Sequence, residues 1–368
     1  MVKIKATNQA LLAPLQHVTG IVERRHTLPI LSNVLIQAHG GTVDFVATDL
    51  EVQITAKAVL EASTAEGSVT VGARKLYDIL RSLPEDAEVA LDAKENRMTV
   101  RAGKSRFNLQ TLAAADFPRM VESRDATRTL TLPQKALKNA LRLVQFAMAV
   151  QDIRYYLNGV LFSVDKNMLR VVATDGHRLS FAAEALGSDH ESIEAILPRK
   201  TVIELIKLLG DTDEPVTLSI GSNQVRFSLG GIEIVSKIVE GKFPDYQKVI
   251  PTAHHNKVQI DRVALAQSLN RAAILSNDKI RGVRLVFTKN ALSIICTNNE
   301  QEEAEEGLTI DYDGDPLDIG FNISYLLDVL NHVDSETVTV TMGDSNSSAL
   351  FQIPGNDDFK YVVMPMRI

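Results

Sequence analysis

The sequence predicts an α+β protein made of three copies of one small domain. Three blocks of residues recur in the same order in each third of the chain. They are centred on Thr48, Thr174 and Thr297, on Val34, Val160 and Val283, and on Lys75, Lys200 and Ser324. In the Thr and Val sets the copies lie 126 and then 123 residues apart. In the third set the copies lie 125 and then 124 residues apart. A period this long exceeds that of solenoid repeats, so each copy should fold as a domain.

The repeat divides the 368 residues into expected domains at 1–127, 128–252 and 253–368. Hydrophobic residues make up 45% of the chain and charged residues 23%, which is enough for an ordinary core in each domain.

Each copy begins with a stretch whose apolar residues recur at helical spacing, as Leu137, Leu141, Val144 and Met148 do. The three predicted first helices are Asn8–Val22, Pro133–Ala149 and Asp261–Ser276. In the second copy Thr131 followed by Pro133 is typical of a helix start. Alternating runs then predict strands, which in the first copy are Asn33–Ala38, Val43–Ala47 and Val52–Val59.

A second helix follows in each copy, at Ala73–Leu83, Pro198–Leu209 and Asn322–Val333. Further strands close the unit, and in the first copy they are Glu88–Asp92, Arg97–Arg101 and Arg106–Thr111. Two helices and several antiparallel strands in each copy give the α+β class.

Charge is unevenly distributed along the chain. The net charge is −7. The six helical stretches, counted over residues 10–25, 72–83, 133–149, 198–210, 261–276 and 322–333, together carry +8, so the remainder carries −15. If the helices share one side, that side is a positive surface in an acidic shell, as in proteins that bind nucleic acid. The alternative is that helices simply tolerate Lys and Arg well.

Two charged runs of opposite sign stand near the ends of this array. The basic run is Arg97, Arg101, Lys104 and Arg106, and the acidic run is Glu300, Glu302, Glu303, Glu305 and Glu306. Each run alone is typical of a solvated face. As a pair they indicate head-to-tail contact between two chains, which gives a closed ring if the rotation closes.

Several function classes are disfavoured. The single cysteine, Cys296, lies in an apolar run and is expected in the core, which fits a reducing cytosol. No signal core and no 18-residue apolar run is present, so we expect a soluble, cytoplasmic protein. We expect no metal or cofactor, and without a Walker motif no ATP hydrolysis.

One enzyme hypothesis is a hydrolase that uses Asp175 and His177. Near-adjacent residues rarely give the geometry for catalysis, and no nucleophile accompanies them. The other copies have Leu50-Glu51 and Asn299-Glu300 at the positions of Gly176-His177, so the turn belongs to the fold and His177-Arg178 is specific to the middle copy. Binding therefore fits better than catalysis, and a passive scaffold that never touches DNA is a third alternative.

Long segments of the chain resemble the bacterial DNA sliding clamp family, the beta subunit of DNA polymerase III. They are residues 151–162, 173–180, 241–246, 271–285, 298–306 and 361–368. The resemblance covers the whole chain. It implies a non-catalytic processivity factor in DNA replication: a head-to-tail homodimeric ring of six domains, with helices lining the hole and sheets outside. Such a ring encircles duplex DNA without sequence specificity and tethers polymerases to it.

The resemblance also implies functional residues. Candidates for DNA contact are Arg25, Arg74, Gln151, Tyr155, Tyr156 and Lys200. A peptide pocket for the polymerase alpha subunit, the clamp loader delta subunit, other polymerases and repair proteins would be lined by Leu157, Thr174, Gly176, His177, Arg178, Leu179, Pro244, Lys248, Val249, Asn322, Tyr325, Val362, Val363, Met364, Pro365, Met366 and Arg367.

For the dimer interface, the resemblance implies a basic side, an acidic side and an apolar centre. These are Lys75, Arg97, Lys104 and Arg106; Glu300, Glu302, Glu303, Glu305 and Glu306; and Phe107, Leu109, Ile274 and Leu275. Lys248, Ile280 and Ile368 depart from the enterobacterial pattern, which has arginine, phenylalanine and leucine there.

Overall fold

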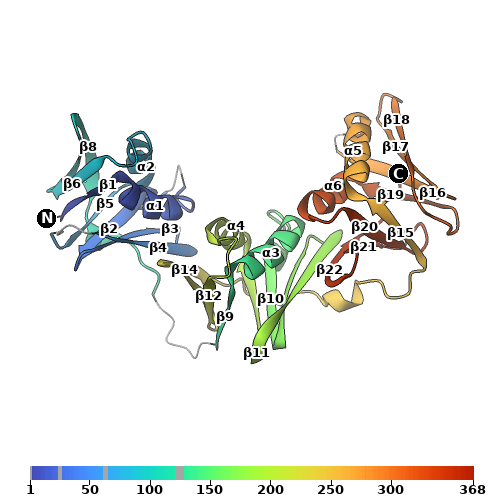
Figure 1. Ribbon diagram of the computed structural model, residues 1–368, viewed down its shortest axis with the longest axis horizontal. Helices are drawn as coiled ribbons and strands as arrows, with labels where there is room; N and C mark the ends of the chain where they lie inside the picture. The colour runs from blue at the N-terminus through green and yellow to red at the C-terminus, as the bar shows by residue number, and fades with distance from the viewer. Residues whose placement is uncertain (1, 24–26, 61–64, 122–127, 278) are drawn as a thin grey trace. The chain divides into compact units, whose positions relative to one another are not determined.

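The computed structural model describes residues 2–23, 27–60, 65–121, 128–277 and 279–368 (Figure 1). Within these ranges it has six α-helices, two in each third of the chain. They are α1 (Asn8–Thr19), α2 (Ala73–Arg81), α3 (Gln134–Val144), α4 (Arg199–Leu208), α5 (Arg262–Ala272) and α6 (Ile323–His332). All six predicted helices are confirmed.

The first helix of each pair ends earlier than its apolar pattern predicts. After α3 and α5 the chain tightens into 3₁₀ turns at Gln145–Ala147 and Ala273–Leu275. Pro133 is the last residue of strand β9 (Arg128–Pro133), and the helix begins one residue later. A proline that ends an edge strand fits because its missing N–H then faces no neighbour.

One hydrogen-bond pattern recurs in all three copies and ties each first helix to the end of the second. The backbone N–H of Asn8, Gln134 and Arg262 donates to the carbonyl of Ala87, Glu214 and Glu336, respectively, at 2.8 to 3.0 Å. The side chains of the same three residues add bonds to this end of the second helix: Asn8 donates to Leu80 O, Gln134 accepts from Gly210 N and Arg262 donates to Leu330 O. The three copies therefore share these hydrogen bonds as well as their sequence pattern.

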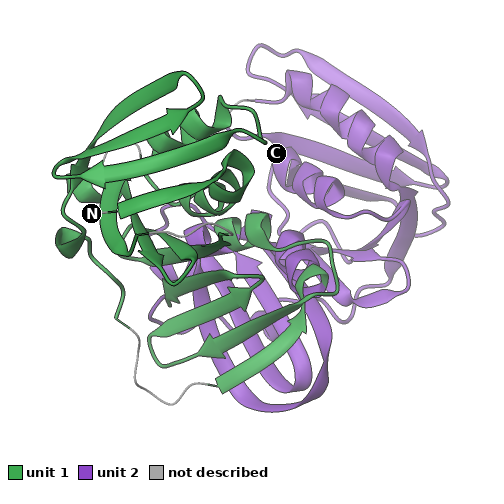
Figure 2. Cartoon of the chain, turned by 60° about the vertical axis from the view of Figure 1, so that its left-hand side comes forward, with its two compact units in different colours: residues 1–135, 203–238 green, residues 136–202, 239–368 purple. Residues whose placement is uncertain are grey.

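By compactness the described chain forms two units, residues 1–135 with 203–238 and residues 136–202 with 239–368 (Figure 2). The first unit contains one antiparallel sheet of twelve strands in the order β1-β6-β7-β8-β5-β2-β3-β4-β14-β13-β12-β9. Its strands are β1 (Val2–Thr7), β2 (Asn33–His39), β3 (Thr42–Thr48), β4 (Val52–Val59), β5 (Gly67–Gly72), β6 (Glu88–Lys94), β7 (Arg97–Ala102), β8 (Ser105–Leu112), β9, β12 (Pro215–Ile220), β13 (Gln224–Leu229) and β14 (Ile232–Lys237). In this unit α1 packs on α2, β3 and β4.

The second unit contains two sheets, ordered β10-β11-β22-β21-β20-β15 and β18-β17-β16-β19. Their strands are β10 (Gly159–Thr174), β11 (Arg178–Pro198), β15 (Asn256–Asp261), β16 (Gly282–Thr288), β17 (Ala291–Thr297), β18 (Glu303–Thr309), β19 (Leu317–Asn322), β20 (Thr337–Met342), β21 (Ala349–Ile353) and β22 (Asn356–Val363). Here α5 packs on α6, β17 and β18.

Strand pairing crosses both predicted domain boundaries. β4 pairs with β14, and β11 pairs with β22 from Arg178↔Val363 to Ala182↔Phe359. The sheets therefore continue from one predicted domain into the next, which explains why compactness divides the chain within residues 128–252. The boundaries themselves stay a prediction.

Cys296 lies on β17 with 1% of its surface exposed, so its predicted place in the core is confirmed. None of the helices among the described residues is long and apolar enough to cross a membrane.

Candidate functional site

The turn between β10 and β11 is built by its own side chains. Thr174 Oγ1 donates to Arg178 O at 2.6 Å and accepts from Gly176 N at 3.1 Å. Asp175 Oδ1 accepts from the backbone N–H of His177 and Arg178 at 2.9 and 3.1 Å. Gly176 has φ +90°, a conformation that glycine adopts without strain.

The first copy repeats this turn bond for bond. Thr48 Oγ1 donates to Val52 O at 2.9 Å, and Asp49 Oδ1 accepts from Glu51 N and Val52 N at 2.9 and 2.8 Å. The prediction that the turn belongs to the fold is confirmed. What distinguishes the middle copy is the pair of side chains, His177 and Arg178, that the turn presents.

Arg178 connects the turn to three other elements. Its Nε donates to Asp175 Oδ2 at 3.0 Å, its Nη1 to Asp328 Oδ2 on α6 at 2.5 Å, and its Nη2 to Phe146 O at 2.7 Å. The guanidinium also lies 4.3 Å from the centre of the Tyr325 ring. Burial alone would lower the pKa of Arg178, but Tyr361, Asp328 and Asp175 outweigh it and raise that pKa. The side chain is 10% exposed and permanently charged, so it fixes these elements around the turn.

An apolar hollow of about 260 Å³, which we call the hydrophobic pocket, opens beside this turn. Its lining comes from the Tyr155–Leu157 3₁₀ turn, the β10–β11 turn, the Tyr246–Lys248 turn and the end of β22. The residues are Arg154, Tyr156, Leu157, Thr174, Gly176, His177, Arg178, Leu179, Pro244, Tyr246, Val249, Val362 and Met364. Apart from Arg154, Tyr156 and Tyr246, each of these is among the predicted pocket residues.

Arg154, Tyr156 and Tyr246 were not among the pocket predictions. Arg154 donates to Asp175 O at 3.3 Å, so it reaches the pocket from a separate loop. It also binds Asp152 through two side-chain bonds, and this Arg154 contact lowers the pKa of Asp152 to about 2. Tyr246 lies 5.8 Å from the Phe181 ring. All three residues lie within segments that carry the family resemblance, 151–162 and 241–246. Membership in these segments was the sequence feature that could have pointed to them as pocket residues.

Seven predicted pocket residues lie around the hydrophobic pocket without lining it. Lys248 pairs with Asp245 at 2.9 Å, Asn322 accepts from Ser324 N at the start of α6, and Tyr325 lies under Arg178. Val363 is fully buried. Pro365, Met366 and Arg367 continue the chain beyond Met364, whose N–H donates to His177 O.

The predicted DNA contacts are distributed over both units. Arg74 on α2 is exposed and donates to Val22 O, and Lys200 lies in the first turn of α4. Gln151 and Tyr155 are exposed in one loop, with Tyr155 at 61%, whereas Tyr156 is half-buried and lines the pocket. Arg25 lies outside the described residues. Gln151, Tyr155 and Tyr156 thus share one loop, and the rings of Tyr155 and Tyr156 lie 6.3 Å apart.

The predicted dimer residues fall on two strand edges. Arg97, Lys104, Arg106, Phe107 and Leu109 lie on or beside β7 and β8, and Lys75 lies on α2. The acidic residues lie on or just before β18, and Ile274 and Leu275 lie in the 3₁₀ turn after α5. Ile274 is 77% exposed. Glu306 is already paired with Arg271 at 2.5 Å.

The geometry speaks against catalysis at Asp175 and His177. Both Asp175 oxygens are occupied by the turn and by Arg178, and none of these bonds involves the His177 ring. No group of His, Cys, Asp and Glu among the described residues could hold a metal ion. Burial raises the pKa of Cys296 to about 11, so it is no nucleophile.

Comparison with known proteins identifies the family. Family models for the N-terminal, central and C-terminal domains of the DNA polymerase III beta subunit match residues 2–121, 131–245 and 247–367. The chain belongs to the bacterial beta sliding clamp family. The beta sliding clamp of Pseudomonas putida is 48% identical over 361 residues, 98% of each chain, and that of Escherichia coli K12 is 46% identical over the full length of both.

Solved sliding clamps share the fold. A crystal structure of the Pseudomonas aeruginosa sliding clamp bound to griselimycin matches with a TM-score of 0.96 at 45% identity, covering 100% of both chains. A Caulobacter crescentus beta sliding clamp matches with a TM-score of 0.92 at 36% identity, covering 100% and 99%. The expected class, three α+β clamp domains, is thereby confirmed, as is the expectation of a DNA polymerase III processivity factor that is not an enzyme. Sliding clamp membership implies DNA and a DNA polymerase as partners.

Proposed function

We propose that two copies of this chain join head to tail into a closed ring around duplex DNA in the bacterial cytoplasm, and that the hydrophobic pocket holds partner proteins on that ring. The proposed domains are 1–127, 128–252 and 253–368. The observation that carries the proposal is a pair of open strand edges of opposite charge.

The first open edge is that of β8. This strand pairs with β7 along its length but meets β5 only at Leu112 and Thr111, so the other edge of residues 105–110 is unpaired among the described residues. β18 is an edge strand of its own four-stranded sheet. Unpaired edges are templates for strand addition from another chain.

Charge gives the two edges a preferred pairing. Lys104 and Arg106 are exposed at β8, and Glu303 and Glu305 are exposed on β18. Complementary charge speeds encounter and fixes register, whereas like charges oppose it. The exposed Ile274 beside β18 and the half-buried Phe107 and Leu109 on β8 supply apolar area for the centre of the contact.

Charge reversal tests this interface. Lys104→Glu with Arg106→Glu should weaken dimerisation at least about tenfold, because like charges then face each other. Sedimentation velocity over a dilution series measures the shift. Lys257→Glu with Lys289→Glu is the matched control, since both lysines are exposed, lie on neither β8 nor β18 and change the net charge equally.

Reversing the acidic edge as well completes the design. A chain that carries Lys104→Glu, Arg106→Glu, Glu303→Lys and Glu305→Lys has complementary edges again, so it should regain the dimer. A quadruple variant that stays monomeric while folded, or a basic-edge variant that dimerises like the control, would rule out this interface.

For DNA, contact through phosphates is supported by the residue types. Arg25, Arg74 and Lys200 offer charge, and Gln151, Tyr155 and Tyr156 offer hydrogen-bonding groups. Contacts of these groups with phosphates carry no sequence information, as sliding requires. In the described helices several cations are paired within the chain, such as Lys135 with Asp213 and Lys207 with Glu204. The Lys135–Asp213 pair is exposed on both sides and therefore weak, so a phosphate can compete for Lys135.

For partners, we propose that the hydrophobic pocket takes a short segment of the polymerase alpha subunit, the clamp loader delta subunit, and other polymerases and repair proteins in turn. An apolar wall with an adaptable methionine, Met364, suits varied peptides, and His177 and Arg154 add polar groups that fix orientation. The Pseudomonas aeruginosa clamp binds griselimycin. If griselimycin takes the hydrophobic pocket of this chain, it should compete with a polymerase peptide, and Met364→Glu should weaken both.

A further inference from the structure

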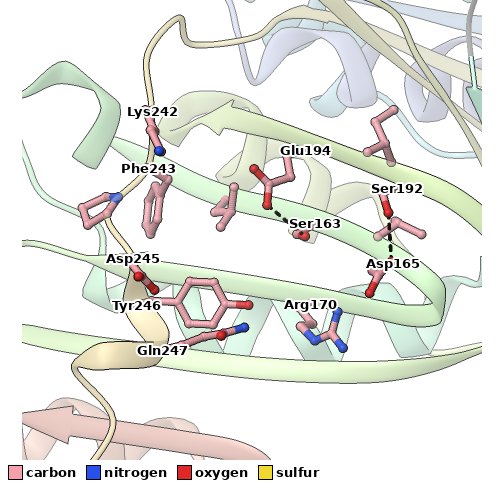
Figure 3. A pocket seen from close by; sticks show the side chains of 14 residues that line it. Ser163, Asp165, Arg170, Ser192, Glu194, Lys242, Phe243, Asp245, Tyr246 and Gln247 are labelled. Carbon is pink, nitrogen blue, oxygen red and sulfur yellow. Dashed lines mark hydrogen bonds between the residues drawn. The ribbon is translucent and has the colours of Figure 1, made fainter.

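A second hollow, of about 600 Å³, shares part of its lining with the hydrophobic pocket, and Figure 3 shows it from close by. We call it the polar groove. It is formed by β10, by β11 and by the segment 242–247. Pro244 and Tyr246 line both hollows, so a single stretch of chain separates them. A ligand that crosses this divide meets both surfaces.

The polar groove differs from the pocket in chemistry. Leu161 and Phe243 are buried in it, but charged side chains surround them: Asp165, Arg170, Glu194, Lys242 and Asp245 (Figure 3). A partner segment here would need polar residues.

Every carboxylate of the polar groove already has a partner. Asp165 accepts from Ser192 Oγ at 2.8 Å, Glu194 accepts from Ser163 Oγ at 3.4 Å, and Asp245 pairs with Lys248 Nζ at 2.9 Å. These bonds hold the acidic groups within the chain's own network.

Arg170 has no such partner. It lies near the end of β10 and is half-buried, and within the described ranges no oxygen forms a hydrogen bond or ion pair with its guanidinium. Five N–H donors in a fixed plane match a carboxylate in bidentate geometry. Partial burial strengthens such a pair relative to one in open solvent. The polar groove can therefore bind an anion at the guanidinium of Arg170.

We infer that the polar groove receives the acidic flank of the same partner segment whose apolar residues fill the hydrophobic pocket, and that a carboxylate of that flank pairs with Arg170. This inference rests on the proposed function of the pocket. The segment passes over Tyr246, whose ring is part of both walls, and the buried Phe243 lies beside its path. Affinity for a partner then depends on charge outside the apolar motif as well as on the motif itself.

Synthetic segments of the DNA polymerase III alpha subunit provide the probe. The shortest segment that binds this chain is found by truncation and is then extended by six residues at either end. One glutamate is placed at each added position in turn, and lysine replaces it in a second series. Fluorescence anisotropy measures the Kd of each peptide for the full chain, for Arg170→Ala and for Arg170→Glu.

The short segment should bind all three chains equally. At one position the glutamate peptide should bind the parent chain about three- to tenfold tighter than Arg170→Ala, the range of a partly exposed ion pair. Arg170→Glu should prefer the lysine peptide at that same position. Arg284→Ala is the matched control, because Arg284 also projects from a strand of this unit but lines neither hollow, and it should change nothing.

Three outcomes overturn the inference. Arg170 has no role if no glutamate extension improves binding. The same holds if Arg284→Ala weakens binding of the glutamate peptides as much as Arg170→Ala does. A short segment that itself weakens with Arg170→Ala shows that the groove only supports the pocket. If no segment of the alpha subunit binds the parent chain, the proposed pocket function fails and this inference fails with it.

Discussion

At the scale of single residues, Cys296 reports how its environment sets chemistry. It is the only cysteine, it is 1% exposed, and burial raises its pKa to about 11. An ordinary thiol ionises near pH 8.5. The unfolded chain therefore ionises first, so this group leaves folding stability unchanged below about pH 8.5 and reduces it as the pH rises toward 11.

Labelling measures this directly. At pH 8 a thiol-reactive chromophore should label the native chain at least about tenfold more slowly than the urea-unfolded chain, because thiolate is the reactive species and access is blocked. Cys296→Ser gives the background. Equal rates for native and unfolded chains would show that β17 opens readily or that the thiol is exposed.

Arg178 shows where residue-level prediction ends. Comparison of the three copies separates the turn-forming Thr174 and Asp175 from the pair specific to the middle copy, and every bond of the turn is local. The bonds of Arg178 to Phe146 O and Asp328 join residues 32 and 150 positions away. No local sequence pattern contains these long-range contacts. The family resemblance could therefore identify Arg178 as a site residue, but periodicity could not predict which residues its side chain binds.

At the scale of elements, the segment after β22 is held by two glycines. Met366 N donates to Gly320 O at 2.8 Å, and a Cβ at Gly320 would lie 2.4 Å from Met366 O. A Cβ at Gly282 would lie 3.1 Å from Ile368. Close backbone approach requires glycine at Gly320, and Met364 reaches the hydrophobic pocket because the following residues are fixed here.

Gly320→Ala should displace this segment, weaken peptide binding about tenfold and destabilise the chain by about 1 to 3 kcal/mol through overpacking. Anisotropy with a polymerase peptide and urea unfolding measure the two effects. Gly187→Ala is the matched control, since a Cβ there meets nothing within 4 Å. Deleting residues 364–368 should reproduce the binding defect. Unchanged binding with Gly320→Ala would show that the pocket does not depend on the fixed segment.

Elements also differ in how well the sequence predicts them. The six helices and six strands of the first copy follow from periodicity, because each pattern is local. The strands Val2–Thr7 and Gly67–Gly72 do not follow from it, and neither do the lengths of β10 and β11, at 16 and 21 residues. These strands are specified by their partners: β1 pairs with β6 some 86 residues later, from Thr7↔Glu88 to Val2↔Ala93, and β11 pairs with β22. Sheet pairing of this kind is non-local and leaves little trace in a single segment.

At the scale of the whole molecule, the repeat predicts three like domains, and the family models match three domains in turn. The sequence could not predict that the sheets run through the boundaries, because β4–β14 and β11–β22 pairings join different copies. Edge-to-edge pairing between copies is also the logic of the proposed dimer, in which β8 and β18 would continue the same arrangement from one chain to the next. A protein that closes in this way holds DNA by topology.

Topological holding has a salt signature that electrostatic binding lacks. A protein held only by six to ten phosphate contacts loses about 10³- to 10⁵-fold in affinity when salt rises from 50 to 200 mM. An encircling clamp loaded onto a nicked circular plasmid should remain bound when salt rises from 50 to 200 mM. It should dissociate when a restriction enzyme linearises the plasmid, because it can then slide off the ends. Gel filtration of labelled protein with the DNA, after loading by the clamp loader of the same bacterium, measures retention.

The variant Arg74→Ala with Gln151→Ala separates the two contributions. If these side chains guide DNA through phosphate contacts, loading should slow, while retention on the closed circle should match that of the parent chain once loading is complete, because the ring and not the contact holds the DNA. The basic-edge reversal, Lys104→Glu with Arg106→Glu, should do the opposite and lose retention even at 50 mM salt. Equal release from circular and linear plasmid by the parent chain would exclude encirclement and leave phosphate contact as the only attachment.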